Sequence, residues 1–252
     1  MKITASSLAY YRRQLRDPSL TALLIIQVLI TFVLIPASAA GERVPPSVPV
    51  ALLLLVISIV VFVAEGRWTM FAGVGLMAAS GIVGYIERSL PGLPARIGAS
   101  GMSLLAYATL GYLVWRAVFG PGSVNAHRIR GAVVLYLTIG LIFASVDRII
   151  AETIPGAYRG VPPVTDLRGF NAAMTYFSFA TLTTVGYGDI TPVAPIARSI
   201  AMLEAIAGML FPRDTARPDR HAGHRDPALD AETPHAGQPS GEAAGGSRGL
   251  NP

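Results

Sequence analysis

The stretch "TLTTVGYGDITP", residues 181–192, sets two glycines around a tyrosine, with threonine hydroxyls before them and an acid after them. Apolar segments lie on both sides, at residues 170–183 and 194–211. Glycine weakens helices and strands alike. In a membrane, non-helical backbone is tolerated only where it is buried in protein or lines a water-filled cavity. The stretch is therefore either a turn outside the membrane or a segment whose function depends on its exposed carbonyl oxygens.

The composition places the rest of the chain in a membrane. Of 252 residues, 52% are hydrophobic and only 14% are charged, whereas soluble domains carry about 25% charged residues. The net charge of +5 comes from scattered basic residues without an aromatic-basic stripe, which argues against nucleic-acid binding. The absence of cysteine excludes disulfides and thiolate metal sites. We expect a multi-pass membrane protein.

Apolar runs of membrane-crossing length follow one another, separated by connectors that contain proline and glycine. A helix needs about 20 apolar residues to cross the hydrocarbon core. The predicted spans are residues 20–36, 49–64, 68–86, 99–119, 132–150 and 194–211. Residues 170–183 are also apolar, but a helix of this length reaches only about 20 Å and cannot cross.

The start of the chain allows a second interpretation. A basic leader, an apolar run and "ASA" near residue 39 also fit a signal peptide with its cleavage site, and its removal would leave five crossings. The length of the run favours a span. Arginines alternate weakly between the loops and favour a cytoplasmic N-terminus. Six crossings would return the C-terminus to the cytoplasm and place the loop after residue 150 outside.

These pieces predict a re-entrant loop between the fifth and sixth spans. A helix at residues 171–182 would enter from outside, and its C-terminal end would carry about half a negative charge towards the membrane centre. The strand at residues 184–188 would then run outward. Glycine tolerates the dihedral angles that turn successive carbonyls to one side, where they could replace the hydration shell of a cation. One chain supplies a quarter of each oxygen ring, so four subunits would meet on an axis.

The segment "TTVGYGD", residues 183–189, resembles the signature of the potassium channel family. "YFSF", residues 176–179, resembles the aromatic stretch of that family's pore helix, and Asp189 matches the acid at the outer mouth. Arg198 and Gly208 stand where many members carry an arginine and a hinge glycine in the inner helix. The resemblance covers about residues 127–211.

The resemblance implies a role for each residue of the strand. Thr184 would offer K⁺ its hydroxyl and carbonyl oxygens, and the next three residues would offer carbonyls: Val185, Gly186 and Tyr187. The Tyr187 ring would pack behind the filter, and Gly188 would let the chain turn outward. The residues expected to support the filter are Thr183, Asp189, Tyr176, Phe177 and Glu204.

Two residues of the sixth span, Glu204 and Gly208, each allow two interpretations. Glu204 is an intramembrane acid, which is costly and functional by default. It either faces the ion cavity or, as we favour, bonds a hydroxyl behind the filter such as Thr181 or Thr183. Gly208 is either a gating hinge or a site of close helix packing.

Other candidates carry weaker expectations. Asp147 and Arg148 end the fifth span and are expected to form a solvated interfacial pair. His221 and His224 have a loose metal-ligand spacing in a polar tail, where we expect no metal site. Aromatic residues near span ends are expected to anchor the interface: Trp68, Tyr112 and Trp115. The fourth span carries only Arg116, so we expect little voltage sensing.

The composition changes abruptly at Pro212, beyond which apolar residues nearly vanish and disorder is expected. One explanation is a short inner helix followed by a solvated cytoplasmic tail. The other, which we favour, is a shifted reading frame in GC-rich DNA, because this tail is rich in Arg, Pro, Ala, Gly, Asp and His. The coding DNA tests it: another frame after Phe211 should continue an apolar helix.

The sequence thus predicts an all-α membrane protein with four N-terminal spans in residues 1–126, a pore domain in residues 127–211 and a tail in residues 212–252. The expected function is passive, selective K⁺ conduction by a homotetramer in a bacterial inner membrane or plasma membrane, with K⁺ and the lipid bilayer as its partners. We expect no enzymatic activity and no cofactor. The alternative is a non-conducting truncated subunit or a modulator of intact channels.

Overall fold

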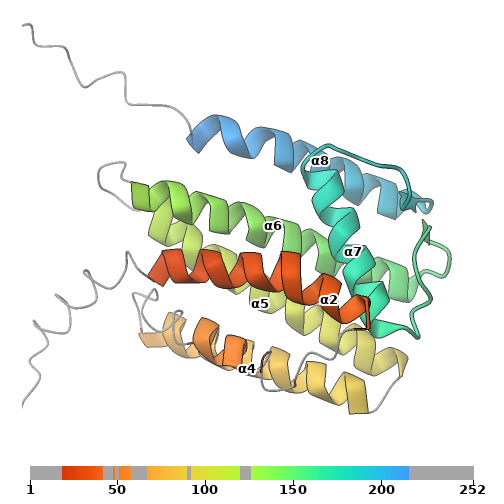
Figure 1. Ribbon diagram of the computed structural model, residues 1–252, viewed down its shortest axis with the longest axis horizontal. Helices are drawn as coiled ribbons and strands as arrows, with labels where there is room; N and C mark the ends of the chain where they lie inside the picture. Colours follow the sequence, from red (N-terminus) through yellow and green to blue (C-terminus); the bar gives the residue numbers. More distant parts are fainter. Residues whose placement is uncertain are drawn as a thin grey trace, which may run out of the picture. The chain divides into compact units, whose positions relative to one another are not determined.

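The computed structural model describes residues 19–41, 48, 51–57, 67–89, 92–119 and 126–215. Its helices and strands are η1 (Ile30–Leu34), α2 (Ile35–Ala39), α4 (Arg67–Ser89), α5 (Leu93–Phe119), α6 (Ala126–Thr153), β1 (Tyr158–Arg159), α7 (Leu167–Leu182), β2 (Thr191–Pro192) and α8 (Pro195–Thr215) (Figure 1). Residues 19–29 are helical and continue into η1 and α2 as one helix. The described residues are therefore almost entirely helical.

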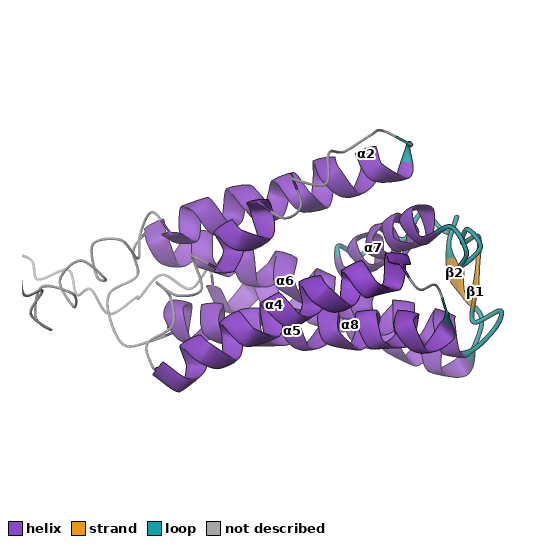
Figure 2. Cartoon of the chain, turned by 90° about the horizontal axis from the view of Figure 1, so that it is seen from below, coloured by secondary structure: helices purple, strands orange, loops and turns teal. Residues whose placement is uncertain are grey.

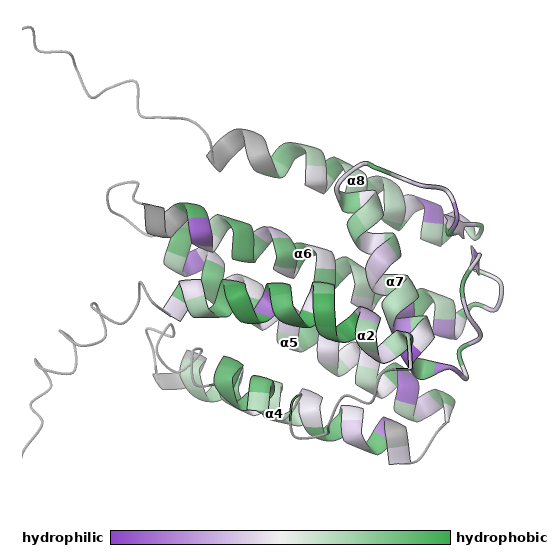
Figure 3. Ribbon diagram, viewed as in Figure 1, coloured by the Kyte–Doolittle hydropathy of each residue, from purple (hydrophilic) through white to green (hydrophobic). Residues whose placement is uncertain are grey.

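Four described helices are long and apolar enough to cross a membrane: Ser19–Ala39, Met70–Glu87, Leu93–Phe119 and Ile129–Thr153. They correspond to the first, third, fourth and fifth predicted spans, and Figure 3 shows hydrophobic residues along much of their length. Of the predicted second span only residues 51–57 are described, and they are helical. The predicted sixth span forms α8, which is not among these four candidates.

Several predictions concern residues outside the described part of the chain. These are the basic leader before residue 19, most of the second span, and the tail beyond residue 215 with His221 and His224. The two explanations of that tail therefore stay predictions. The backbone of α8 continues past Phe211 to Thr215.

The N-terminal helices, meaning the helix Ser19–Ala39 with α4 and α5, pack against α6 through apolar side chains. α5 lies between α4 and α6 and contacts both. One hydrophobic cluster joins these helices, with Leu23, Leu110, Val114 and Val134 among its members. Since apolar surface in lipid gains little from burial, close packing and polar contacts between helices matter more than in water. Gln27 Nε2 accordingly donates to the Thr138 hydroxyl at 3.1 Å across this interface.

The C-terminal module comprises α6, β1, α7, β2 and α8. α7 packs against both α6 and α8, and a second buried cluster, including Ile150, Phe170, Met174 and Ala197, lies between them. β1 and β2 pair antiparallel, with Tyr158 opposite Pro192 and Arg159 opposite Thr191 (Figure 2). This pairing closes the chain into a loop around α7 and the residues that follow it.

The structure corrects one expectation from the sequence. Asp147 and Arg148 do not form a solvated interfacial pair: the Asp147 side chain is fully buried, and the Arg148 side chain is only 13% exposed. Asp147 is bound by Tyr158 of β1, and Arg148 is bound by Glu87 of α4 as well as by Glu152 on its own helix. Both residues are therefore part of the buried structure.

Candidate functional site

The site begins with α7, a helix of 16 residues. At about 1.5 Å per residue it is roughly 24 Å long, still short of a bilayer crossing. It begins at Leu167, four residues before the predicted start, because the Asp166 side chain caps it by accepting from the Gly169 amide at 3.1 Å. It ends at Leu182, as the sequence predicts, and Thr183 follows as its C-cap.

After α7 the backbone amides turn back onto the end of the helix. Thr183 N donates to Phe179 O at 3.0 Å, and Thr184 N donates to Thr181 O at 2.9 Å. Val185 N and Gly186 N then converge on a single acceptor, Ala180 O, each at 3.0 Å. Residues 184–188, which we call the strand as in the sequence prediction, form no β-strand in the structure, and the amides of Thr184, Val185 and Gly186 face the end of α7.

The strand has alternating backbone conformations. Thr184, Gly186 and Gly188 have positive φ angles of 61°, 54° and 81°, whereas Val185 and Tyr187 are not among the positive-φ residues. A positive φ at every second residue is compatible with an alternation of left-handed and right-handed residues, which points successive amides to one side and successive carbonyls to the other. Thr184 is the one described non-glycine residue in the left-handed region. Its conformation carries steric strain of about 1–2 kcal/mol, a cost that concentrates at functional sites.

The strand is open on the side away from α7. Every residue from 183 to 189 is exposed in the single chain, with Val185 53% and Tyr187 70% exposed. Within the part of the chain that the structure describes, the carbonyl oxygens of residues 184–188 accept no hydrogen bond. A row of exposed carbonyl dipoles is chemically suited to a cation.

Aromatic rings support the strand and α7 from two sides. Tyr176 and Tyr187 stack with their centroids 6.0 Å apart and their planes at 14°. Phe177 is buried and meets the Tyr158 ring edge-on at 5.3 Å. Asp189, at the far end of the strand, accepts from the Ile190 amide at 3.0 Å. Tyr176 therefore contacts a residue of the strand and Phe177 packs against Tyr158, while the filter-support role of Tyr176, Phe177 and Asp189 stays a prediction.

Glu204 is fully buried and receives its hydrogen bond from Ser178, on the inner face of α7, and not from Thr181 or Thr183. The Ser178 hydroxyl also lies 2.7 Å from Gly140 O on α6. A serine hydroxyl has one hydrogen for these two acceptors. Ser178 can therefore satisfy only one of these acceptors at a time, and it satisfies both contacts together only when Glu204 is protonated and donates to it. The sequence predicted a hydroxyl partner for Glu204 but not that it would be Ser178, and the contact joins α6, α7 and α8.

Gly208 lies against the end of α7. A Cβ atom added there would stand 1.7 Å from Leu182 O and 3.2 Å from Leu182 Cα. The same Leu182 carbonyl accepts from the Tyr136 hydroxyl at 3.3 Å. Close packing of α8 on the end of α7 therefore requires glycine at position 208, and its role as a hinge stays a prediction.

Asp147 and Tyr158 form a second buried polar contact in the C-terminal module. The Tyr158 hydroxyl donates to Asp147 Oδ1 at 2.8 Å, while Asp147 Oδ2 has no hydrogen-bond partner among the described residues. Burial, and after it the neighbouring Asp147, raises the pKa of Tyr158 above its usual range, so its hydroxyl keeps the hydrogen that it donates. This bond ties β1 to α6 beside the buried face of α7.

Comparison with known proteins finds similarity to ion channels in one part of the chain. Residues 163–212 match a family model described as ion channel. The chain is 34% identical over 76 residues to the inward rectifier potassium channel Kirbac3.1 of Paramagnetospirillum magnetotacticum. That match covers 30% of this chain and only 23% of the relative. No solved structure matches the chain.

Proposed function

We propose that this chain, which carries an ion-channel segment and is related to the potassium channel family, is one subunit of a homotetramer that conducts K⁺ passively and selectively. In this proposal α6 and α8 are the outer and inner helices of the pore domain, residues 127–211. α7 is the re-entrant pore helix, and residues 184–188 are the filter. The N- and C-termini lie in the cytoplasm.

One observation carries the proposal: the left-handed conformation recurs at Thr184, Gly186 and Gly188, while the amides of Val185 and Gly186 face the end of α7. Carbonyls turned away from α7 can replace the water around a cation when four strands meet on one axis. In this arrangement, carbonyls of residues 184–187 and the Thr184 hydroxyl coordinate K⁺.

The exposure of the strand supports four subunits. Residues 183–189 are exposed in the single chain although apolar segments flank them. In a membrane, such backbone must be buried in protein or line a water-filled cavity. Three further copies would provide both: their filters would complete each oxygen ring, and their helices would cover Val185 and Tyr187.

Flux measurements in liposomes test this function. The purified chain should pass K⁺ in strong preference to Na⁺, and its mass in detergent should equal four chains. Gly186→Ala should abolish the flux, because Gly186 has φ +54° and nothing lies within 4 Å of its Cβ position, so only the backbone conformation opposes alanine.

Gly101→Ala is the matched control. Gly101 also has nothing within 4 Å of its Cβ position, but it lies within α5 without a positive φ. Its variant should conduct like the original chain. A stable monomer, or equal K⁺ and Na⁺ flux through the unmodified chain, would refute the proposed function.

A further inference from the structure

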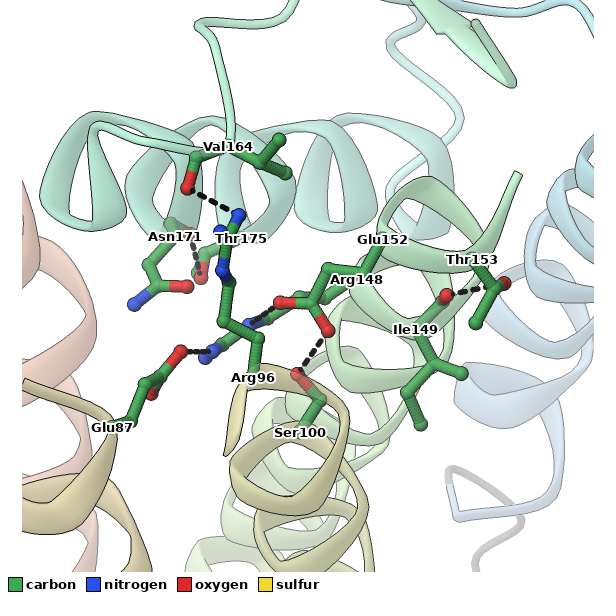
Figure 4. A network of polar contacts seen from close by, with 10 residues as sticks. All are labelled: Glu87, Arg96, Ser100, Arg148, Ile149, Glu152, Thr153, Val164, Asn171 and Thr175. Carbon is green, nitrogen blue, oxygen red and sulfur yellow. Dashed lines mark hydrogen bonds and ion pairs between the residues drawn. The ribbon is translucent and has the colours of Figure 1, made fainter. Parts of the chain in front are cut away.

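A polar network joins the N-terminal helices to the C-terminal module at the end of α6 (Figure 4). Arg148 on α6 forms an ion pair with Glu87 on α4 through Nη2, and its Nε donates to Glu152 Oε1 at 2.9 Å. The Glu152 side chain is fully buried and that of Glu87 is 7% exposed. One guanidinium therefore holds two carboxylates in a place nearly closed to solvent.

The network extends to α5. The fully buried Ser100 donates its hydroxyl hydrogen to Glu152 Oε2 at 2.8 Å. We call Glu87, Ser100, Arg148 and Glu152 the clamp. Removing one member of a buried ion pair leaves the other charge uncompensated, so such a group stays together as a unit. The clamp therefore fixes the ends of α4, α5 and α6 to one another.

Arg96 connects the clamp to the segment before α7. It lies four residues before Ser100 on α5, so both occupy one face of that helix. Its Nη1 donates to Val164 O at 3.2 Å. Val164 precedes the helix cap Asp166 by two residues, and Asp166 N donates to Pro163 O at 2.9 Å within the same turn. Arg96 thus holds the turn from which α7 begins.

The first turns of α7 carry a buried acceptor that has no partner among the described residues. Figure 4 shows Arg96 extending from α5 towards the carbonyl oxygen of Val164, and it also draws Asn171 and Thr175 of α7. Asn171 Oδ1 is buried and has no hydrogen-bond partner among the described residues. A guanidinium carries five N–H donors. One of these donors binds Val164 O.

We propose that α4 and α5 control conduction by positioning the start of α7 through the clamp and Arg96. α7 is one uninterrupted helix, so a displacement of its start is transmitted to its end, where the amides of the strand are bound. Arg96 and Arg148 are positioning residues, because they act on the filter strand through α7. This inference rests on the proposed function for its flux readout, and its structural readout is independent of that function.

Hydrogen exchange and K⁺ flux of the full-length chain in liposomes test the inference together. Arg96→Gln should make the amides of residues 164–170 exchange about tenfold faster, because one charge-assisted hydrogen bond is lost. K⁺ flux should fall several-fold while the preference for K⁺ over Na⁺ persists. Arg148→Gln should increase the exchange rate and lower the K⁺ flux more than Arg96→Gln does. Arg96→Lys should retain more K⁺ flux than Arg96→Gln. Arg159→Gln, an exposed arginine outside the clamp, is the matched control and should change neither readout.

The outcomes are distinguishable. Unchanged exchange in residues 164–170 with unchanged flux in folded Arg96→Gln would overturn the inference. Faster exchange confined to α4 and α5 would also overturn it, because it would mean that the clamp only holds the N-terminal helices together. If Arg148→Gln does not fold, Arg96→Gln still decides. If the unmodified chain passes no K⁺, the proposed function fails, whereas the exchange of residues 164–170 still tests the contact.

Discussion

Asp147 and Arg148 are consecutive residues of α6, and their side chains enter two different buried networks. Asp147 accepts from Tyr158 inside the C-terminal module, whereas Arg148 binds Glu87 of α4 and Glu152. Consecutive residues on a helix point about 100° apart. α6 therefore contacts both the N-terminal helices and the rest of the C-terminal module. This pair of residues lies where the two parts of the chain meet.

Tyr158→Phe should destabilise the fold by about 1–3 kcal/mol, because it leaves both oxygens of the buried Asp147 without a partner. Adding Asp147→Leu to this variant should recover part of the loss, since no unsatisfied carboxyl group then remains. Denaturant unfolding in detergent measures both effects. Tyr85→Phe, at a tyrosine that is 69% exposed, is the control and should be neutral. Equal stability of Tyr158→Phe and Tyr85→Phe would contradict this account.

Glu204→Gln should keep both stability and K⁺ flux, because a glutamine amide can accept from the Ser178 hydroxyl through its oxygen or donate to it through its nitrogen. Ser178→Ala should lower the free energy of unfolding by about 1–3 kcal/mol, because it leaves the buried Glu204 carboxyl group without a partner. Thermal unfolding and K⁺ flux of the two variants distinguish a structural role of Glu204 from a role in the ion cavity. A carboxylate that must be ionised in the ion cavity predicts the reverse order, with Glu204→Gln the more damaging change.

Gly208→Ala should lower the free energy of unfolding by about 1–3 kcal/mol or prevent tetramer assembly, because the added methyl group overlaps the backbone of Leu182. Gly84→Ala, at a helical glycine with nothing within 4 Å of its Cβ position, is the control and should be tolerated. The tetramer fraction in detergent and the unfolding midpoint are the measurements. Normal stability with altered open probability in Gly208→Ala would instead favour the hinge.

Asp166→Ala should destabilise the start of α7 by about 1 kcal/mol, the usual effect of removing a side-chain N-cap. Asp166→Asn should restore most of this loss, because its amide oxygen can accept from Gly169 N in the same way. Exchange rates of the amides in residues 167–170 report the change directly. If both variants exchange alike and faster than the original chain, the charge and not the cap is what matters at this position.

The membrane class, four helices long and apolar enough to cross a membrane, and the end of α7 at Leu182 could be predicted from the sequence. The reason is that these features depend on neighbours along the chain: the length of an apolar run, the helix period and the glycines that permit positive φ at positions 186 and 188. The family resemblance of residues 183–189 is local in the same sense.

The partners of the buried polar residues were decided only by tertiary structure. Glu204 meets Ser178 across 26 positions, Arg148 meets Glu87 across 61, and Arg96 meets Val164 across 68. Gly208 is required by the backbone of Leu182, which lies on another helix. No local pattern encodes such pairs, because the energy of a polar side chain in the membrane interior depends on which groups the packing of helices brings within hydrogen-bonding distance.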